Sequence, residues 1–374
     1  MNESLPQDQQ NENAVTAETA ADETAVPETA AEVAMPGAEE KKPEPAWKKT
    51  LKFLLKFGVS AGILTYIVCT RDIKWADFKL VQPWCIVAAF FAVYTQLSLT
   101  AVRWFTLLRA AGVNCSFREA FSLQMQGMFF SQFLPGGSVG GDVVKAGILA
   151  TRTPPGGKFN VVFSIFVDRL CGLGALLIAL LGTCLICRDT IARFPEGSRH
   201  GLMVMCAICG ALLCVVIFVF FSDLLYKVKF FKFFLDIADR ITKDTFKRAA
   251  DAVALYRRNW KLLLGWIAAT TLVFFPVLSL PVWVMANGFE GAPHRDFLPC
   301  LMISNVSQTI AAIPGSFGGT GTRDIACAEM MTAMGFTDTE SGVIPILVTM
   351  VTLLVALSCS LFFIFDRGKR APKA

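Results

Sequence analysis

The sequence predicts an all-α polytopic membrane protein with six to eight transmembrane helices. Of its 374 residues, 54% are hydrophobic and only 17% are charged, whereas soluble domains carry about 25% charged residues. Four segments run for 22 or more residues without an Asp, Glu, Lys or Arg. Because a helix needs about 20 apolar residues to cross the hydrocarbon core, each segment is long enough to span a membrane. These segments are residues 80–102, 201–222, 262–289 and 341–365.

The first 46 residues are expected to form a disordered acidic tail. Residues 1–40 contain ten acidic residues and no Lys or Arg, and no aromatic residue precedes Trp47. Such a segment cannot bury enough apolar surface to offset the entropy that it loses on ordering. It also lacks the basic start and the apolar core of a signal peptide. We therefore expect the transmembrane domain at residues 47–366, followed by a basic tail at 367–374.

The basic residues predict that both termini lie in the cytoplasm and that the protein sits in the cell (inner or plasma) membrane. Six lysines precede or enter a first apolar segment, roughly residues 53–70, and four basic residues follow the last one. The connection 222–261 carries ten basic residues against five Asp, so it too should be cytoplasmic. Its apolar positions fit either an amphipathic helix on the membrane surface or an ordinary helix packed on the bundle. We read the basic excess as a sign of topology and expect no nucleic-acid partner.

Counting crossings from both ends leaves two segments that enter and leave on the same side. Residues 119–158 start and finish in the cytoplasm, whereas residues 298–342 start and finish outside, as do the connections 188–200 and 287–297. Each of the two segments contains an apolar piece broken by a Pro-Gly turn. Such a break predicts a re-entrant hairpin of two short helices. The second helix of each hairpin is expected to start after Gly141 and after Gly321.

The two predicted hairpins share a sequence pattern. Each contains a Ser-Gln pair, at 131–132 and at 307–308, which is followed by Pro-Gly and then by Ser-x-Gly-Gly. We interpret the two halves, about residues 50–187 and 201–365, as a repeat. With an odd number of crossings in each half, the second copy would be inverted, and the hairpins would meet near mid-membrane. Inverted-repeat transporters bind their substrates at such discontinuous helices.

Three motifs resemble the lysylphosphatidylglycerol synthase transmembrane region, a family also described as flippase-like. They are FLPGGSVGGDVVKAGIL at 133–149, FSIFVDRLCGLGALL at 163–177 and IPGSFGGTGTRD at 313–324, and the pair Arg103-Trp104 also fits. The resemblance covers about residues 50–366. The bacterial multiple-peptide-resistance factor has a membrane half that belongs to this family, and this half moves aminoacylated phosphatidylglycerol between leaflets. The resemblance therefore implies lipid transport, and we do not expect the synthase activity because no soluble synthase domain follows the last predicted span.

Two positions depart from the family pattern, which commonly has Arg at position 145 and Arg-Glu at positions 323 and 324. Here Lys145 and the pair Arg323-Asp324 occupy these positions. Charge is kept in both cases, but Lys lacks the bidentate fork that Arg offers to a phosphate.

The polar residues of the broken helices and of one span are the candidate site for a lipid headgroup. Asp168 and Arg169 lie about ten residues into a span that starts near Phe159, where a charge is costly unless it is paired or hydrated. They either bind substrate or form a structural ion pair, with Asp142 or Asp324 as candidate partners. The glycine turns either expose helix N-termini that attract phosphate or only allow close packing. The candidate headgroup-binding residues are Ser138, Gly140, Gly141, Asp142, Lys145, Asp168, Arg169, Ser316, Gly318, Gly319, Arg323 and Asp324.

Five uncharged polar residues of the hairpins either line a groove for the headgroup or bond across helices. They are Gln124, Gln126, Gln132, Asn305 and Gln308.

We expect a transporter, or flippase, that moves an anionic phospholipid or a lipid-linked molecule, with membrane lipids as its partners. No cofactor or metal is predicted, because the two His are far apart and the C-x-x-C pairs at 184–187 and 206–209 lie in apolar helical stretches. Two alternatives remain open. One is a membrane-embedded lipid-modifying enzyme that uses Asp142, Asp168 or Asp324 as a base, and the other is a non-transporting partner of a separately encoded lipid synthase.

Overall fold

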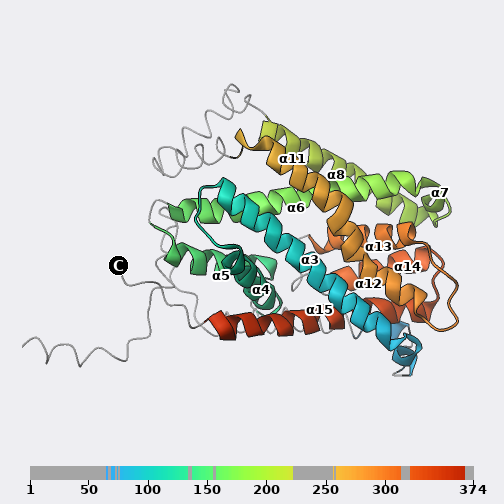
Figure 1. The fold of residues 1–374 in the computed structure, drawn as a ribbon. Coiled ribbons are helices and arrows are strands. Elements are labelled where there is room, and N and C mark those ends of the chain that lie inside the picture. The colour runs from blue at the N-terminus through green and yellow to red at the C-terminus, as the bar shows by residue number, and fades with distance from the viewer. Residues whose placement is uncertain are drawn as a thin grey trace, which may run out of the picture. The chain divides into compact units, whose positions relative to one another are not determined.

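The computed structural model describes residues 76–133, 137–154, 157–221, 258–312 and 321–366, together with 65, 69–71, 74 and 256. All of them belong to one structural unit, residues 41–374. The N-terminal tail, most of the predicted span 53–70, most of the connection 222–261 and the basic tail lie outside the described residues. Figure 1 shows a bundle of helices, and the one β-bridge of the described chain pairs Val81 with Phe289.

The described elements are, in order along the chain, η1 (Asp77–Leu80), α3 (Pro83–Ala110), α4 (Phe117–Phe133), α5 (Ser138–Arg152), α6 (Lys158–Ile186), α7 (Arg188–Ile191), α8 (Glu196–Phe221), α11 (Trp260–Ala269), η4 (Thr270–Phe274), α12 (Phe275–Asn287), α13 (Phe297–Ala311), α14 (Thr322–Ala333) and α15 (Asp338–Asp366).

Five helices within the described residues are long and apolar enough to cross a membrane. They are α3, α6, α8, the continuous helix formed by α11, η4 and α12, and α15. These helices coincide with five of the six spans that the sequence predicts, and the sixth, at 53–70, lies outside the described residues. The all-α polytopic class is thereby confirmed, whereas the full number of crossings stays a prediction.

Both predicted hairpins are present as pairs of short helices that pack on each other, α4 with α5 and α13 with α14. In each pair the second helix follows a glycine with positive φ, 58° at Gly137 and 88° at Gly321. Only glycine adopts this conformation without steric cost. The predicted start of α14 is correct, but α5 begins at Ser138 rather than after Gly141, so Gly140 and Gly141 lie inside its first turns.

The contacts between helices follow a two-fold pattern. If α3, α4, α5 and α6 correspond to α12, α13, α14 and α15, the contact of α4 with α15 has its counterpart in the contact of α13 with α6. The contact between α3 and α12 then corresponds to itself. Each hairpin therefore packs against the last long helix of the other half. This is the arrangement that a repeat requires, while its inversion across a membrane stays a prediction.

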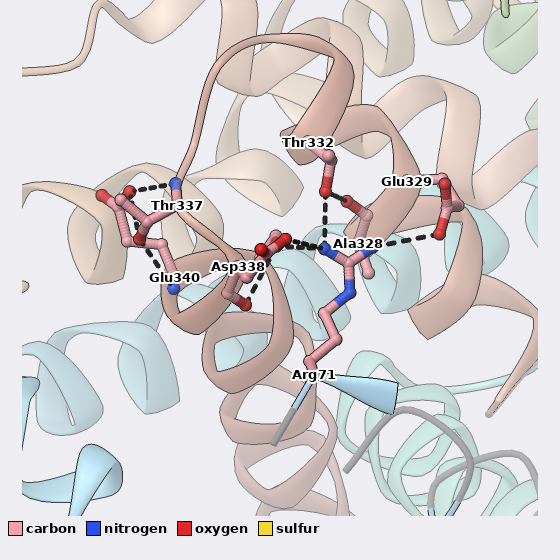
Figure 2. Close-up of polar contacts among 8 residues, drawn as sticks. Arg71, Ala328, Glu329, Thr332, Thr337, Asp338 and Glu340 are labelled. Carbon is pink, nitrogen blue, oxygen red and sulfur yellow. Dashed lines mark hydrogen bonds and ion pairs between the residues drawn. The ribbon is translucent and has the colours of Figure 1, made fainter. Parts of the chain in front are cut away.

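One end of the bundle gathers connections that are predicted to face outside. Figure 2 shows Arg71, which follows the predicted first span, between the end of α14 and the start of α15. Its guanidinium lies 3.0 Å from Glu329 and 3.2 Å from Asp338. The start of α3 lies at this end as well, and there the backbone amide of Gln82 donates to the carbonyl of Gly288 at 3.0 Å.

The opposite end of α3 contacts a residue of the connection that is predicted to be cytoplasmic. There, the hydroxyl of Tyr256 donates to the carbonyl of Leu107 at 2.9 Å. Gly288 and Tyr256, which belong to connections predicted on opposite sides, thus lie at opposite ends of α3, and which end faces the cytoplasm stays a prediction.

Cysteine labelling tests this sidedness. In a cysteine-free background, we expect a membrane-impermeant maleimide to label Ser198→Cys, at the start of α8, in intact cells. Thr151→Cys, at the end of α5, should react only after the membrane is permeabilised. Both positions are exposed, so accessibility in the folded protein does not limit either reaction. The reverse pattern would overturn the assignment of both termini to the cytoplasm.

Candidate functional site

A cavity of about 320 Å³ lies among the two hairpins and the long helices. Its volume is at the lower end of the range for small-molecule sites, about 300–1,000 Å³. Half of the predicted headgroup-binding residues line it, namely Ser138, Asp142, Lys145, Arg169, Arg323 and Asp324. The predicted repeat halves therefore contribute to one site.

Asp142 is shared by two cations on the α5 side of the cavity. Its Oδ1 lies 3.1 Å from Nζ of Lys145, and its Oδ2 lies 2.5 Å from Nε of Arg169 on α6. The two cations differ in their surroundings, because the side chain of Lys145 is 2% exposed and that of Arg169 is 53% exposed. Arg169 is consequently the more accessible cation.

Lys145 is fully enclosed by groups that suit an ammonium ion. Besides Asp142, it donates to Oε1 of Gln124 at 3.0 Å, and its Nζ lies 4.6 Å from the centre of the Trp104 ring. A cation over the face of an indole is attracted by the ring electrons. The Trp104 ring in turn donates to the hydroxyl of Ser164 at 3.3 Å. Lys145 is thus held in place by contacts with α4 and α3.

Asp168 does not line the cavity, and the sequence suggested no cation as its partner. It accepts from Nε of Arg103 on α3 at 2.8 Å, and both side chains are buried. Arg169 does pair with Asp142, one of the predicted partners. Adjacent residues on a helix point about 100° apart, so Asp168 faces α3 while Arg169 faces α5.

Arg103 is held by a π-helical turn in the middle of a span. Its Nη1 donates to the hydroxyl of Thr270 at 3.2 Å, and its guanidinium lies 5.4 Å from the centre of the Phe274 ring. Thr270 and Phe274 are the first and last residues of η4. Such π-helical turns are frequent at functional sites. Arg103 also lines the cavity, so it connects the cavity with the buried Asp168.

Asp324 caps the helix on whose first turn it lies. Its carboxylate accepts from the amide of Gly321 at 3.2 Å and from the hydroxyl of Thr349 at 2.8 Å. Arg323 lies 3.2 Å from the same carboxylate and also donates to Thr349. The N-terminus of α14 is therefore already occupied by a carboxylate of its own. By contrast, no side-chain cap of α5 is present among the residues that the structure describes, and the backbone N–H groups of a helix N-terminus attract anions.

One of the two predicted glycines of α5, Gly141, has a packing role. A Cβ atom added to Gly141 would lie 2.2 Å from the carbonyl oxygen of Gly127 on α4. This glycine therefore permits the close approach of the two hairpin helices, and neither it nor Gly140 lines the cavity. Ser316, Gly318 and Gly319 lie outside the described residues.

The predicted uncharged polar residues divide between the two roles that the sequence left open. Gln124, Gln132 and Gln308 line the cavity. Gln126 and Asn305 instead bond to other helices, with Asn305 donating to Thr183 on α6 at 3.4 Å.

Sequence reasoning missed a polar row on α3, formed by Gln96, Thr100 and Arg103, which lines the cavity. Residues spaced by four and three positions share one face of a helix. A polar row at this spacing inside an apolar span was the signal that could have identified it.

The described lining carries four cations, Arg103, Lys145, Arg169 and Arg323, against two carboxylates, Asp142 and Asp324. Asp168 supplies a third carboxylate behind Arg103. The cations therefore outnumber the carboxylates by one, four against three. This excess of positive charge suits an anionic ligand.

Comparison with known proteins gives matches over the membrane part of the chain. A family model described as lysylphosphatidylglycerol synthase TM region matches residues 53–359. The UPF0104 membrane protein PH1989 of Pyrococcus horikoshii is 23% identical over 307 residues, which are 77% of this chain and 88% of that protein. No solved structure matches the chain.

Proposed function

Because the chain belongs to the lysylphosphatidylglycerol synthase TM region family, we propose that it is a lipid transporter, or flippase. It moves an anionic phospholipid or an anionic lipid-linked molecule between the leaflets of the inner membrane. The observation that carries this proposal is the cavity with one cation in excess, between two broken-helix hairpins. Inverted-repeat transporters bind substrates in such places.

Arg169 is the residue most suited to receive the headgroup. Its guanidinium is half exposed, and its carboxylate partner Asp142 also has Lys145 at 3.1 Å. A phosphate can therefore take the place of Asp142 on Arg169 without leaving that carboxylate unpaired. Ser138 and the N-terminus of α5 lie next to it, since Arg169 also donates to the carbonyl of Ser138 at 3.5 Å.

The surroundings of Arg169 favour a lipid over a soluble anion. Phe166, one turn before Arg169 on α6, is 56% exposed, and Val139 and Val143 on α5 are 66% and 65% exposed. Side chains three or four residues apart share a helix face, so Phe166 and Val139 flank the ion pair of Arg169 and Asp142, and Val143 extends the apolar face of Val139. The cavity of about 320 Å³ accepts a headgroup, while the acyl chains stay along the apolar surface.

The geometry is less suited to the alternative of a lipid-modifying enzyme. Each candidate base already accepts from strong donors, Asp142 from Lys145 and Arg169, Asp168 from Arg103, and Asp324 from Thr349. A general base must be able to take a proton from its substrate. Carboxylates engaged in this way serve better as counter-ions that organise the cations.

Replacing Arg169 by glutamine tests the proposal. We expect transfer of a fluorescent phosphatidylglycerol in reconstituted vesicles to fall about tenfold or more, because a charge-assisted bond to phosphate is lost. The thermal midpoint should stay close to that of the wild type, since Lys145 still neutralises Asp142. Arg193→Gln, an exposed arginine outside the cavity, is the matched control and should keep wild-type transfer.

Two results would contradict this role. Wild-type transfer by the Arg169→Gln variant would exclude Arg169 from headgroup binding. Recovery of transfer when Asp142→Asn is added would reduce Arg169 to a structural partner of that carboxylate. The same vesicles also separate the function classes, because an enzyme forms a new lipid product and a non-transporting partner gives neither product nor transfer.

A further inference from the structure

A second cavity, of about 740 Å³, lies where α6, α7 and the start of α8 meet. We call it the α6–α8 groove. It shares no residue with the central cavity. Most of the residues that line it are apolar, and two are arginines. The lining residues are Leu181, Cys184, Leu185, Arg188, Ile191, Ala192, Arg199, Leu202, Met203 and Cys206.

The apolar wall of the groove is exposed at the surface of the bundle. Leu185 is 72% exposed and Met203 is 51% exposed. Both belong to candidate membrane spans, and only 11% of the apolar window of α8 is buried. Since α6 is the main packing partner of α8 among the described helices, an apolar molecule in the groove would add to a sparse interface.

The two arginines lie where a lipid phosphate would be expected. Arg188 is the first residue of α7, two residues after the end of α6, and Arg199 is in the first turn of α8, so both are at the ends of predicted spans. Arg188 is 77% exposed, and its carboxylate contact, Asp189, is at 3.7 Å and is itself 89% exposed. Nε of Arg199 is buried and has no hydrogen-bond partner among the described residues. A buried donor of this kind is costly unless an acceptor reaches it.

From this geometry we propose that the α6–α8 groove is a binding site for an anionic phospholipid that stabilises α8 against α6. The phosphate accepts from Arg188 and Arg199, and an acyl chain lies along Leu185 and Met203. Arginine offers a phosphate a planar pair of donors, and its stem tolerates apolar surroundings. This site does not depend on the transport function, because it involves none of the residues of the central cavity.

A lipid titration of the full-length protein in neutral detergent tests the site. Phosphatidylglycerol should raise the thermal midpoint of the wild type, whereas phosphatidylcholine with the same chains and inorganic phosphate should not. The double variant Arg188→Gln/Arg199→Gln should require about tenfold more phosphatidylglycerol for the same shift. Arg193→Gln lies between the two positions but does not line the groove, and it should respond as the wild type does.

Photo-crosslinking provides a second readout that does not depend on stability. A benzophenone amino acid at position 203, in the groove wall, should crosslink phosphatidylglycerol at least several-fold more than phosphatidylcholine. The neighbouring position 204 is also exposed but does not line the groove, and it should show no such preference.

Four results would overturn the proposal. The first is a double variant whose thermal midpoint responds to phosphatidylglycerol as that of the wild type does, and the second is equal crosslinking of both lipids. The third is a rise in the thermal midpoint with inorganic phosphate alone, and the fourth is crosslinking of position 203 to another part of this chain.

Discussion

Replacing Arg103 by glutamine should lower the free energy of unfolding by about 3–5 kcal/mol, the usual cost of breaking a buried ion pair. The reason is that Asp168 is 3% exposed and Arg103 is its partner at 2.8 Å. Glutamine removes the charge that balances this carboxylate and also the bond to Thr270. Chemical denaturation of the purified protein in detergent, followed by intrinsic tryptophan fluorescence, measures the change.

Adding Asp168→Asn to the Arg103→Gln variant should recover most of this stability, because no unpaired charge then remains in the interior. Arg109→Gln is the matched control, since it replaces an exposed arginine on the same helix and should cost less than about 0.5 kcal/mol. A stable Arg103→Gln single variant would show that Asp168 does not need this partner. A double variant as unstable as the single one would show that the loss comes from other contacts of Arg103.

The contrast with Arg169 is itself informative. Arg103→Gln is expected to destabilise the protein strongly, whereas Arg169→Gln should leave its stability nearly unchanged and impair transfer. Both expectations follow from what remains after the change, because Asp142 keeps Lys145 at 3.1 Å and Asp168 keeps no cation at such a distance among the described residues. Measuring stability and transfer on both variants therefore separates the structural ion pair from the binding cation.

Replacing Gly141 by alanine should disrupt the first hairpin. The added Cβ would lie 2.2 Å from the carbonyl oxygen of Gly127 and 3.0 Å from Cβ of Ser131. The closest of these atoms belongs to a backbone in a helix, which cannot move aside as a flexible side chain would. We expect a loss of stability of about 3 kcal/mol or more, at or above the upper end of the usual cost of overpacking. Transfer should be lost as well, because this contact sets the positions of Gln124, Asp142 and Lys145.

Gly147→Ala is the matched control, because Gly147 lies on the same helix and has no atom within 4 Å of an added Cβ. It should be neutral, or stabilising by up to about 1 kcal/mol through the better helix propensity of alanine. Expression level, thermal midpoint and transfer in vesicles report both variants. Wild-type behaviour of Gly141→Ala would mean that α4 and α5 do not approach each other as closely as described here.

The sequence by itself determined the class of the protein and the location of its breaks. Long uncharged segments predicted the spans, because a helix in lipid must be apolar along its whole length. Parity and the Pro-Gly turns predicted two hairpins, and the structure contains both, with Gly137 and Gly321 at the turns. These features depend on local composition and on periodicity, which a single sequence carries.

Only the tertiary structure decided which polar residues meet. Asp168 and Arg169 are neighbours in sequence, yet one pairs with α3 and the other with α5. Arg103 and Asp168 are 65 residues apart, and no local pattern relates them. Gly141 looked like part of a binding turn and instead packs on Gly127. Pairing in a helical membrane protein depends on how helices rotate and cross, and these angles are fixed by contacts between distant segments rather than by the composition of each helix.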